Sequence, residues 1–166
     1  EGIAFAHAHG VKVYVTANIL AHNGDLEGAK EYFKELKEMK PDALIVADPG
    51  MFTLAREKHI HTCLDTSGIA YDPKHPEKFD ELLNHTDLVL LDIKNIDPDK
   101  HIKVTAQRID NIIAFAHELD RRNIPVWIRH VYVNSELNTD DELRRLGEFM
   151  AHLKNIKVLD VLPYHT

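Results

Sequence analysis

Short apolar runs that alternate with helix-patterned segments constrain the fold of this chain more than any other feature. The runs are rich in β-branched residues and lie at about residues 11–19, 43–48, 59–65, 88–94, 125–133 and 158–165. Between them, apolar side chains recur at helical spacing, as Ala29, Phe33 and Leu36 do in one segment. This alternation is typical of parallel strands joined by right-handed helical crossovers. The sequence therefore predicts an α/β fold with about six parallel strands.

The number of strands limits the architecture further. Six strand–helix units are too few for the usual eight-stranded barrel, which leaves a partial (βα)6 TIM-like barrel or a flatter doubly wound sheet. Polar residues close five of the six runs and are expected to share one rim, which favours the partial barrel. Such a sheet has two open edges, and a homodimer through these edges or a covering helix is one way to protect them.

Length, charge and cysteine content restrict the class of protein. The 166 residues suit one domain, 1–166, and 44% hydrophobic with 28% charged residues is ordinary for a globular protein. A net charge of −7 argues against nucleic acid and anionic membranes as partners, and no apolar run is long enough to cross a bilayer. The one cysteine, Cys63, fits a reducing compartment, so we expect a cytoplasmic protein. The chain begins at Glu1 inside a helical pattern, which suggests an excised or engineered fragment.

Two of the apolar runs become polar at the end where parallel α/β sheets carry their chemistry. The first ends in Asp65 and Thr66, and the second ends in Asp92 and Lys94. Two carboxylates on neighbouring strand ends form a hard oxygen site suited to a cation, and a lysine beside them can hold a carboxylate of a ligand. The alternative is that these residues are rim residues in salt bridges, which a polar barrel mouth needs in any case.

A rival site is a zinc site formed by one of the predicted strands. If the strand begins at His59, the alternation of side chains puts His59, His61 and Cys63 on one face. Histidine and cysteine are zinc ligands, with Asp65 as the natural carboxylate companion. This pattern suggests a zinc-dependent hydrolase-like site as a second alternative function.

Two parts of the chain resemble two different families. Residues 59–166 resemble the pyruvate formate-lyase activating enzymes of the radical S-adenosylmethionine superfamily, through the motifs His-Thr-Cys-Leu-Asp-Thr-Ser-Gly, Thr-Asp-Leu-Val-Leu-Leu-Asp-Ile-Lys, Val-Trp-Ile-Arg-His-Val, Arg-Arg-Leu-Gly-Glu-Phe and Leu-Pro-Tyr-His. Residues 1–58 resemble the peptidase U32 family, through Ala-His-Ala-His-Gly-Val-Lys-Val-Tyr-Val and Pro-Asp-Ala-Leu-Ile-Val-Ala-Asp-Pro-Gly. These resemblances suggest a chimera of two barrel fragments joined near residues 58–61.

The resemblance to the activating enzymes implies roles by position. Residues matching Asp65, Thr66 and Asp92 lie at the S-adenosylmethionine site of that family and at a monovalent cation beside it. Residues that match three further positions also reach the cofactor: Lys94, Arg129 and His165.

Departures from the family pattern shape the functional expectation. The family holds a four-iron cluster with three cysteines in a Cys-x3-Cys-x2-Cys motif, and this chain has Cys63 alone. Its glycine-rich Gly-Gly-Glu stretch is also missing, and the loop after Val133 departs from the family's Val-Pro-Gly turn. We therefore expect an engineered or fused chimeric scaffold with no catalytic residues, no iron–sulfur cluster, no resident metal and no required cofactor. The alternative is a vestigial S-adenosylmethionine-binding module with weak affinity.

Overall fold

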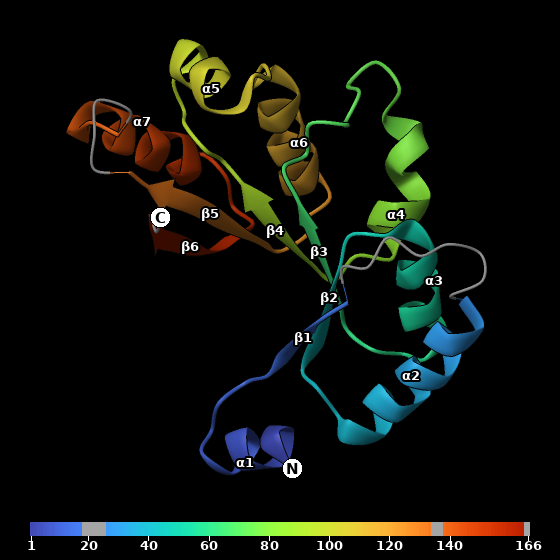
Figure 1. Cartoon of the computed structure of the whole chain (residues 1–166). Coiled ribbons are helices and arrows are strands. Elements are labelled where there is room, and N and C mark those ends of the chain that lie inside the picture. The colour runs from blue at the N-terminus through green and yellow to red at the C-terminus, as the bar shows by residue number, and fades with distance from the viewer. Residues whose placement is uncertain (18–25, 134–137, 165–166) are drawn as a thin grey trace. The chain divides into compact units, whose positions relative to one another are not determined.

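The structure is a computed structural model that describes residues 1–17, 26–133 and 138–164 (Figure 1). The chain divides into two compact units. The first contains residues 1–65 and 84–87, and the second contains residues 66–83 and 88–166.

The first unit alternates helices with short parallel strands. Its elements are α1 (Gly2–Ala8), β1 (Tyr14–Thr16), α2 (Leu26–Met39), β2 (Ala43–Val46), α3 (Pro49–Glu57) and β3 (Thr62–Thr66). β2 pairs in parallel with β1 on one side and with β3 on the other. Its core is built from the apolar faces of these elements and includes Phe33, Leu44, Val46 and Ala55, all of which are fully buried. Burial of this apolar surface is what holds the unit together.

Two aspartates of the first unit, one at the start of α3 and one just before β2, form hydrogen bonds that hold neighbouring backbone segments in place. Asp48 caps α3 by accepting a hydrogen bond of 3.0 Å from the backbone N–H of Met51. Asp42 accepts hydrogen bonds from the backbone N–H of Val13 (2.7 Å) and from Nε2 of His7 (2.8 Å). The bond from Val13, and then that from His7, holds the pKa of the Asp42 carboxyl below its usual value. These bonds tie the segment between α1 and β1 to the start of β2.

The second unit carries the longer strands. Its elements are the 3-10 turn η1 (Pro76–Phe79), α4 (Asp80–Asn84), β4 (Leu88–Asp92), α5 (Pro98–Thr105), α6 (Asp110–Arg121), β5 (Val126–Tyr132), α7 (Asp140–Ala151) and β6 (Ile156–Pro163). β5 pairs in parallel with β4 and with β6. Figure 1 shows α5, α6 and α7 on the same side of these three strands.

Alternation along β5 determines which side chains face these helices. Val126, Ile128 and His130 are buried, whereas Trp127 and Arg129 between them are only partly buried. Because successive side chains of a strand point to opposite faces, Arg129 lies on the face opposite to His130. The sheet thus separates a buried polar residue from a solvent-accessible one at adjacent positions.

The predicted fold class is confirmed as an α/β, partial TIM-barrel-like fold, with the strands in the sequential order β1-β2-β3-β4-β5-β6. Most strands are shorter than predicted, and of the described residues 11–17 β1 contains Tyr14–Thr16, while residues 18 and 19 of the predicted run lie outside the described residues. A single domain over residues 1–166 stays a prediction. Among the described residues, no helix combines the length and the apolar character that a membrane span requires.

Candidate functional site

Three charged residues stand in register across the three strands of the second unit. Asp92, the last residue of β4, is the Cα partner of Arg129 on β5. Arg129 is in turn the Cα partner of Asp160 on β6. Partner residues in parallel strands point to the same face of the sheet. The strands therefore align an acid–base–acid row on the face opposite to the buried His130.

Asp92, at one end of this row, contacts a cation with each of its two carboxylate oxygens. Nε of Arg129 lies 2.9 Å from Oδ1, and Nζ of Lys94 lies 3.0 Å from Oδ2. The side chains of Asp92 and Arg129 are 19% and 21% exposed, whereas Lys94 is 34% exposed. Charge-assisted bonds of this kind are stronger than neutral hydrogen bonds, and partial burial reduces their screening by water. The arrangement holds both cations beside the end of β4.

The charge of this group determines what it can bind. Asp92 and Asp160 balance the charges of Lys94 and Arg129, and a small anion such as a carboxylate is a ligand that the two cations could contact. The salt bridges that the rim-residue interpretation requires are present as well.

Two of the other predicted site residues lie at the end of β3, and the third lies outside the described residues. Thr66 ends β3, where its Oγ1 accepts a hydrogen bond of 3.0 Å from the backbone N–H of Gly68. Asp65 precedes it and is described with the first unit. His165 lies outside the described residues. The roles of Asp65, Thr66 and His165 stay predictions.

A buried polar network beneath the row was missed by sequence reasoning. His130 and Asn138 are buried, and Nδ2 of Asn138 lies 3.0 Å from Nε2 of His130. A second buried histidine, His101 on α5, contacts the backbone oxygen of Asn95. A signal was available for His130. If Arg129 is on the more accessible face of its strand, the next residue is on the face that the helices cover, where a polar group needs a partner.

The structure does not form the predicted zinc site. β3 begins at Thr62, so His59 and His61 precede the strand; His59 sits in a left-handed turn with φ of 53°. Both histidines are exposed and line a surface cavity of about 300 Å³, whereas Cys63 is fully buried. Among the described residues, no three potential metal-binding side chains come close enough to hold an ion. The zinc prediction was wrong because the strand register that it assumed is absent.

Two comparisons of sequence confirm both resemblances. A model of peptidase family U32 matches residues 1–75, which extends past the junction expected near residues 58–61. The pyruvate formate-lyase-activating enzyme of Streptococcus mutans is 48% identical over 118 residues, which cover 70% of this chain and 45% of that protein. The chain thus spans about half the length of the curated relatives that it matches.

Solved structures share the fold at lower identity. A domain of pyruvate-formate lyase-activating enzyme from Bacteroides vulgatus is 21% identical and has a TM-score of 0.61, with 91% of this chain and 80% of that chain covered. Streptococcus suis SuiB bound to S-adenosylmethionine is 14% identical with a TM-score of 0.70, with 98% of this chain and 42% of that chain covered. At these identities the match establishes the fold.

The interpretation as an engineered scaffold without an evolved function was wrong. Identity of 45–48% to proteins named as pyruvate formate-lyase-activating enzymes extends over more than two-thirds of the chain. The overlap of this match with residues 1–75 also leaves no clean junction, and no comparison supports a chimeric or designed origin. The prediction gave more weight to the single cysteine than to the motifs at strand ends that resemble those of the activating enzymes.

Proposed function

We propose that this chain is the S-adenosylmethionine-binding part of a protein of the pyruvate formate-lyase-activating type. The observation that carries the proposal is the contact of Lys94 and Arg129 with the two oxygens of Asp92, the last residue of β4. The name of the 48% identical relative and the S-adenosylmethionine bound to SuiB both support this assignment.

Each member of the cluster has a distinct role in this proposal. Lys94 and Arg129 hold the carboxylate of the methionine moiety, since both are cations that solvent reaches. Asp92 keeps the two cations in place and offers its carboxylate to the ligand's ammonium group. By their match to the family motifs, Asp65, Thr66 and His165 stay the further binding residues that the resemblance implies.

An apolar hollow beside the row favours a ligand with an apolar part. A cavity of about 350 Å³ is lined by Val131, Leu162, Pro163 and Tyr164, at the ends of β5 and β6. Val131 lies two residues beyond Arg129 and therefore on the same face of β5. Binding sites for small molecules commonly combine such an apolar wall with a few charged groups that fix orientation.

The chemistry assigned to this chain stops at binding. In the activating enzymes that the chain resembles, bound S-adenosylmethionine supplies a sulfonium group for reductive cleavage at a cluster held by three thiolates. Cys63 is the one cysteine of this chain, and it is buried on β3, so these residues do not fit a cluster and no step is derived through one. A cytoplasmic location and a homodimer through open strand edges also remain part of the proposal.

Calorimetric titration with S-adenosylmethionine in sodium buffer tests the proposal. We expect saturable binding to the unmodified chain and a loss of at least about tenfold in affinity for Lys94→Ala and Asp92→Asn, because each removes a charge from the site. Absence of saturable heat at millimolar ligand would show that the proposed function is wrong.

The exposed ion pair between Arg108 and Asp110 provides a matched control. Its Nε–Oδ2 distance of 2.9 Å equals the Nε–Oδ1 distance of the Arg129–Asp92 pair, but it lies on the surface at the start of α6. Asp110→Asn should therefore leave the affinity unchanged. A similar loss for Asp92→Asn and Asp110→Asn would assign the effect to overall charge and not to a site.

A further inference from the structure

The segment that follows β4 is held by two buried imidazole rings, one on each side of Lys94. Nδ1 of His130 lies 2.8 Å from the carbonyl oxygen of Ile93, and Nδ1 of His101 lies 3.1 Å from that of Asn95. The two histidines come from β5 and α5 and are 2% and 1% exposed. Lys94 is the residue between the two bonded carbonyls.

The hydrogen bonds of His130 allow one arrangement of protons. A carbonyl oxygen only accepts, so Nδ1 of His130 must carry the hydrogen that it donates to Ile93. Nε2 then accepts from Nδ2 of Asn138, whose Oδ1 accepts the backbone N–H of Val133 at 2.7 Å. The chain of bonds fixes a neutral ring, its tautomer and the orientation of the amide.

His101 adopts the same tautomer for a different reason. Its Nδ1 also donates to a carbonyl, while its Nε2 is buried without a hydrogen-bond partner among the described residues. A proton on Nε2 would bury a charge that nothing accepts, which is costly. Among the described residues, the ring of His101 therefore makes one hydrogen bond, from Nδ1 to the carbonyl oxygen of Asn95.

Two further hydrogen bonds hold the backbone on both sides of Lys94. The position of this backbone then limits where the lysine side chain extends. The backbone N–H of Ile93 donates to the carbonyl of Arg129 at 3.0 Å, and the side chain of Asn95 accepts the backbone N–H of Asp97 at 2.8 Å. A lysine side chain has four rotatable bonds and a large rotamer entropy, so a fixed backbone limits where its ammonium group reaches.

We infer that His130 and His101 are positioning residues that clamp the carbonyls on both sides of Lys94 and so keep its ammonium group at Asp92. This inference deepens the proposed function and rests on it, because the clamped lysine is a proposed ligand-binding residue. Neither histidine touches the ligand. We call the two bonds, His130 to Ile93 and His101 to Asn95, the carbonyl clamp.

Paired substitutions distinguish the effect of losing the hydrogen bond from the effect of replacing the side chain. His101→Asn and His130→Asn keep an N–H donor near the position of Nδ1, whereas His101→Leu and His130→Leu remove the donor. We expect the leucine variants to lose about tenfold in affinity for S-adenosylmethionine and the asparagine variants to recover most of that loss.

A double-mutant cycle distinguishes positioning from general damage to the fold. If the clamp acts through Lys94, His101→Leu should have little further effect on affinity in a Lys94→Ala background. An equal loss in both backgrounds would overturn the inference, since damage that does not act through Lys94 adds independently.

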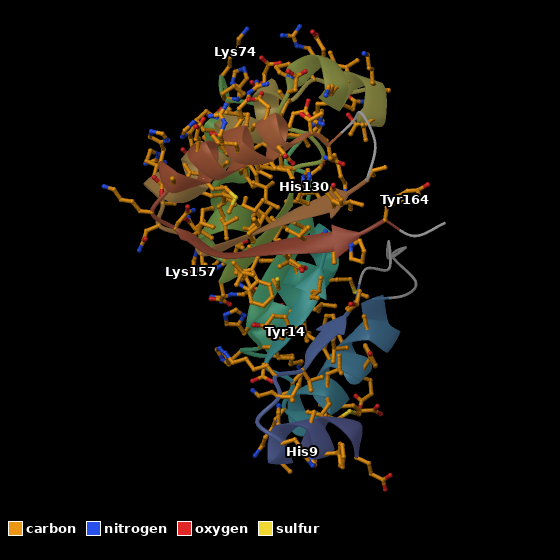
Figure 2. All side chains as sticks on the ribbon, turned by 90° about the vertical axis from the view of Figure 1, so that its left-hand side faces the viewer. His9, Tyr14, Lys74, His130, Lys157 and Tyr164 are labelled. Atoms are coloured by element: carbon orange, nitrogen blue, oxygen red, sulfur yellow. The ribbon has the colours of Figure 1, made fainter. Side chains whose placement is uncertain are left out.

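Chemical labelling of lysine tests the clamp even if the ligand does not bind. The rate of acetylation of Lys94 by acetic anhydride, followed by mass spectrometry of peptides, should rise several-fold in the leucine variants and stay unchanged in the asparagine variants. Lys74, an exposed lysine labelled in Figure 2, serves as the internal reference. Unchanged labelling of Lys94 in all variants would overturn the clamp, whereas faster labelling without ligand binding would overturn the proposed function alone.

Discussion

At the scale of single residues, close contacts decide which positions tolerate change. Gly68 follows the turn that the Thr66 hydroxyl closes, and it has a φ of +72°. A Cβ atom at this position would lie 2.6 Å from Cδ1 of Phe115, which is part of an aromatic cluster with Tyr71 and Phe79. The backbone conformation and the ring both require glycine here.

Replacing this glycine tests that requirement. Gly68→Ala should destabilise the protein by about 2–3 kcal/mol, because it adds a strained φ and displaces a buried ring. Urea denaturation measures the change. Gly147→Ala is the matched control: a Cβ there meets no atom within 4 Å, and Gly147 lies inside α7, so alanine should stabilise by about 0.5–1 kcal/mol. Similar effects at both sites would contradict the packing at Gly68.

At the scale of elements, ion pairs fasten the end of α6. Glu118 is nearly buried and accepts hydrogen bonds from Arg121 (2.7 and 2.8 Å) and from Arg122 (2.6 Å). The hydrogen bonds from Arg121 contribute most to lowering the pKa of Glu118 from 4.5 to about 2. Arg122 also reaches Asp80 on α4, at 2.5 Å. Arg122, which Glu118 holds in place, therefore joins the end of α6 to α4.

Because the pKa of Glu118 is lowered, its contribution to the stability of the fold depends on pH. Because the folded pKa lies below the unfolded value, ionised Glu118 stabilises the fold fully above pH 4.5, and this contribution is lost as the pH falls towards about 2. Glu118→Gln should cost about 1–3 kcal/mol at pH 7 and clearly less at about pH 3 in urea denaturation.

An exposed glutamate provides the comparison for Glu118. Glu148 pairs with Arg144 on the surface of α7, and Glu148→Gln should change stability by at most about 0.5 kcal/mol. A cost for Glu118→Gln that does not depend on pH would contradict the role of its charge.

At the scale of the whole molecule, the strand order leaves β6 paired with β5 alone. Several apolar side chains on and after this strand are exposed: Val158, Leu159, Val161, Leu162 and Tyr164. Figure 2 shows Tyr164 extending away from the ribbon at the end of β6. Open edges with exposed apolar groups tend to pair with other strands.

Self-association through this edge is the corresponding prediction. The sedimentation coefficient should rise with protein concentration, and Val161→Lys should suppress the rise, since a charge on the edge opposes pairing of strands. Ala151→Lys adds the same charge at the exposed end of α7 and should not suppress it. Equal behaviour of the two variants would argue against association through β6.

The sequence predicted the order of helices and strands because apolar periodicity is a local signal. It also placed Asp92 and Lys94 at the end of a strand, where β4 ends at Asp92. Contacts that join distant segments left no local pattern, so the carbonyl clamp and the register of Asp160 with Arg129 required coordinates. The zinc prediction was wrong for a related reason, because strand boundaries depend on tertiary pairing.

The most direct test of the proposed site compares S-adenosylmethionine with its decarboxylated analogue in calorimetric titrations of the same chain. Lys94 and Arg129 are assigned to the ligand's carboxylate, so the analogue should bind at least about tenfold more weakly. The difference should become smaller in Lys94→Ala, which leaves Arg129 as the remaining cation for the carboxylate. Equal affinity of the two ligands for the unmodified chain, or no binding of either, would contradict the central claim.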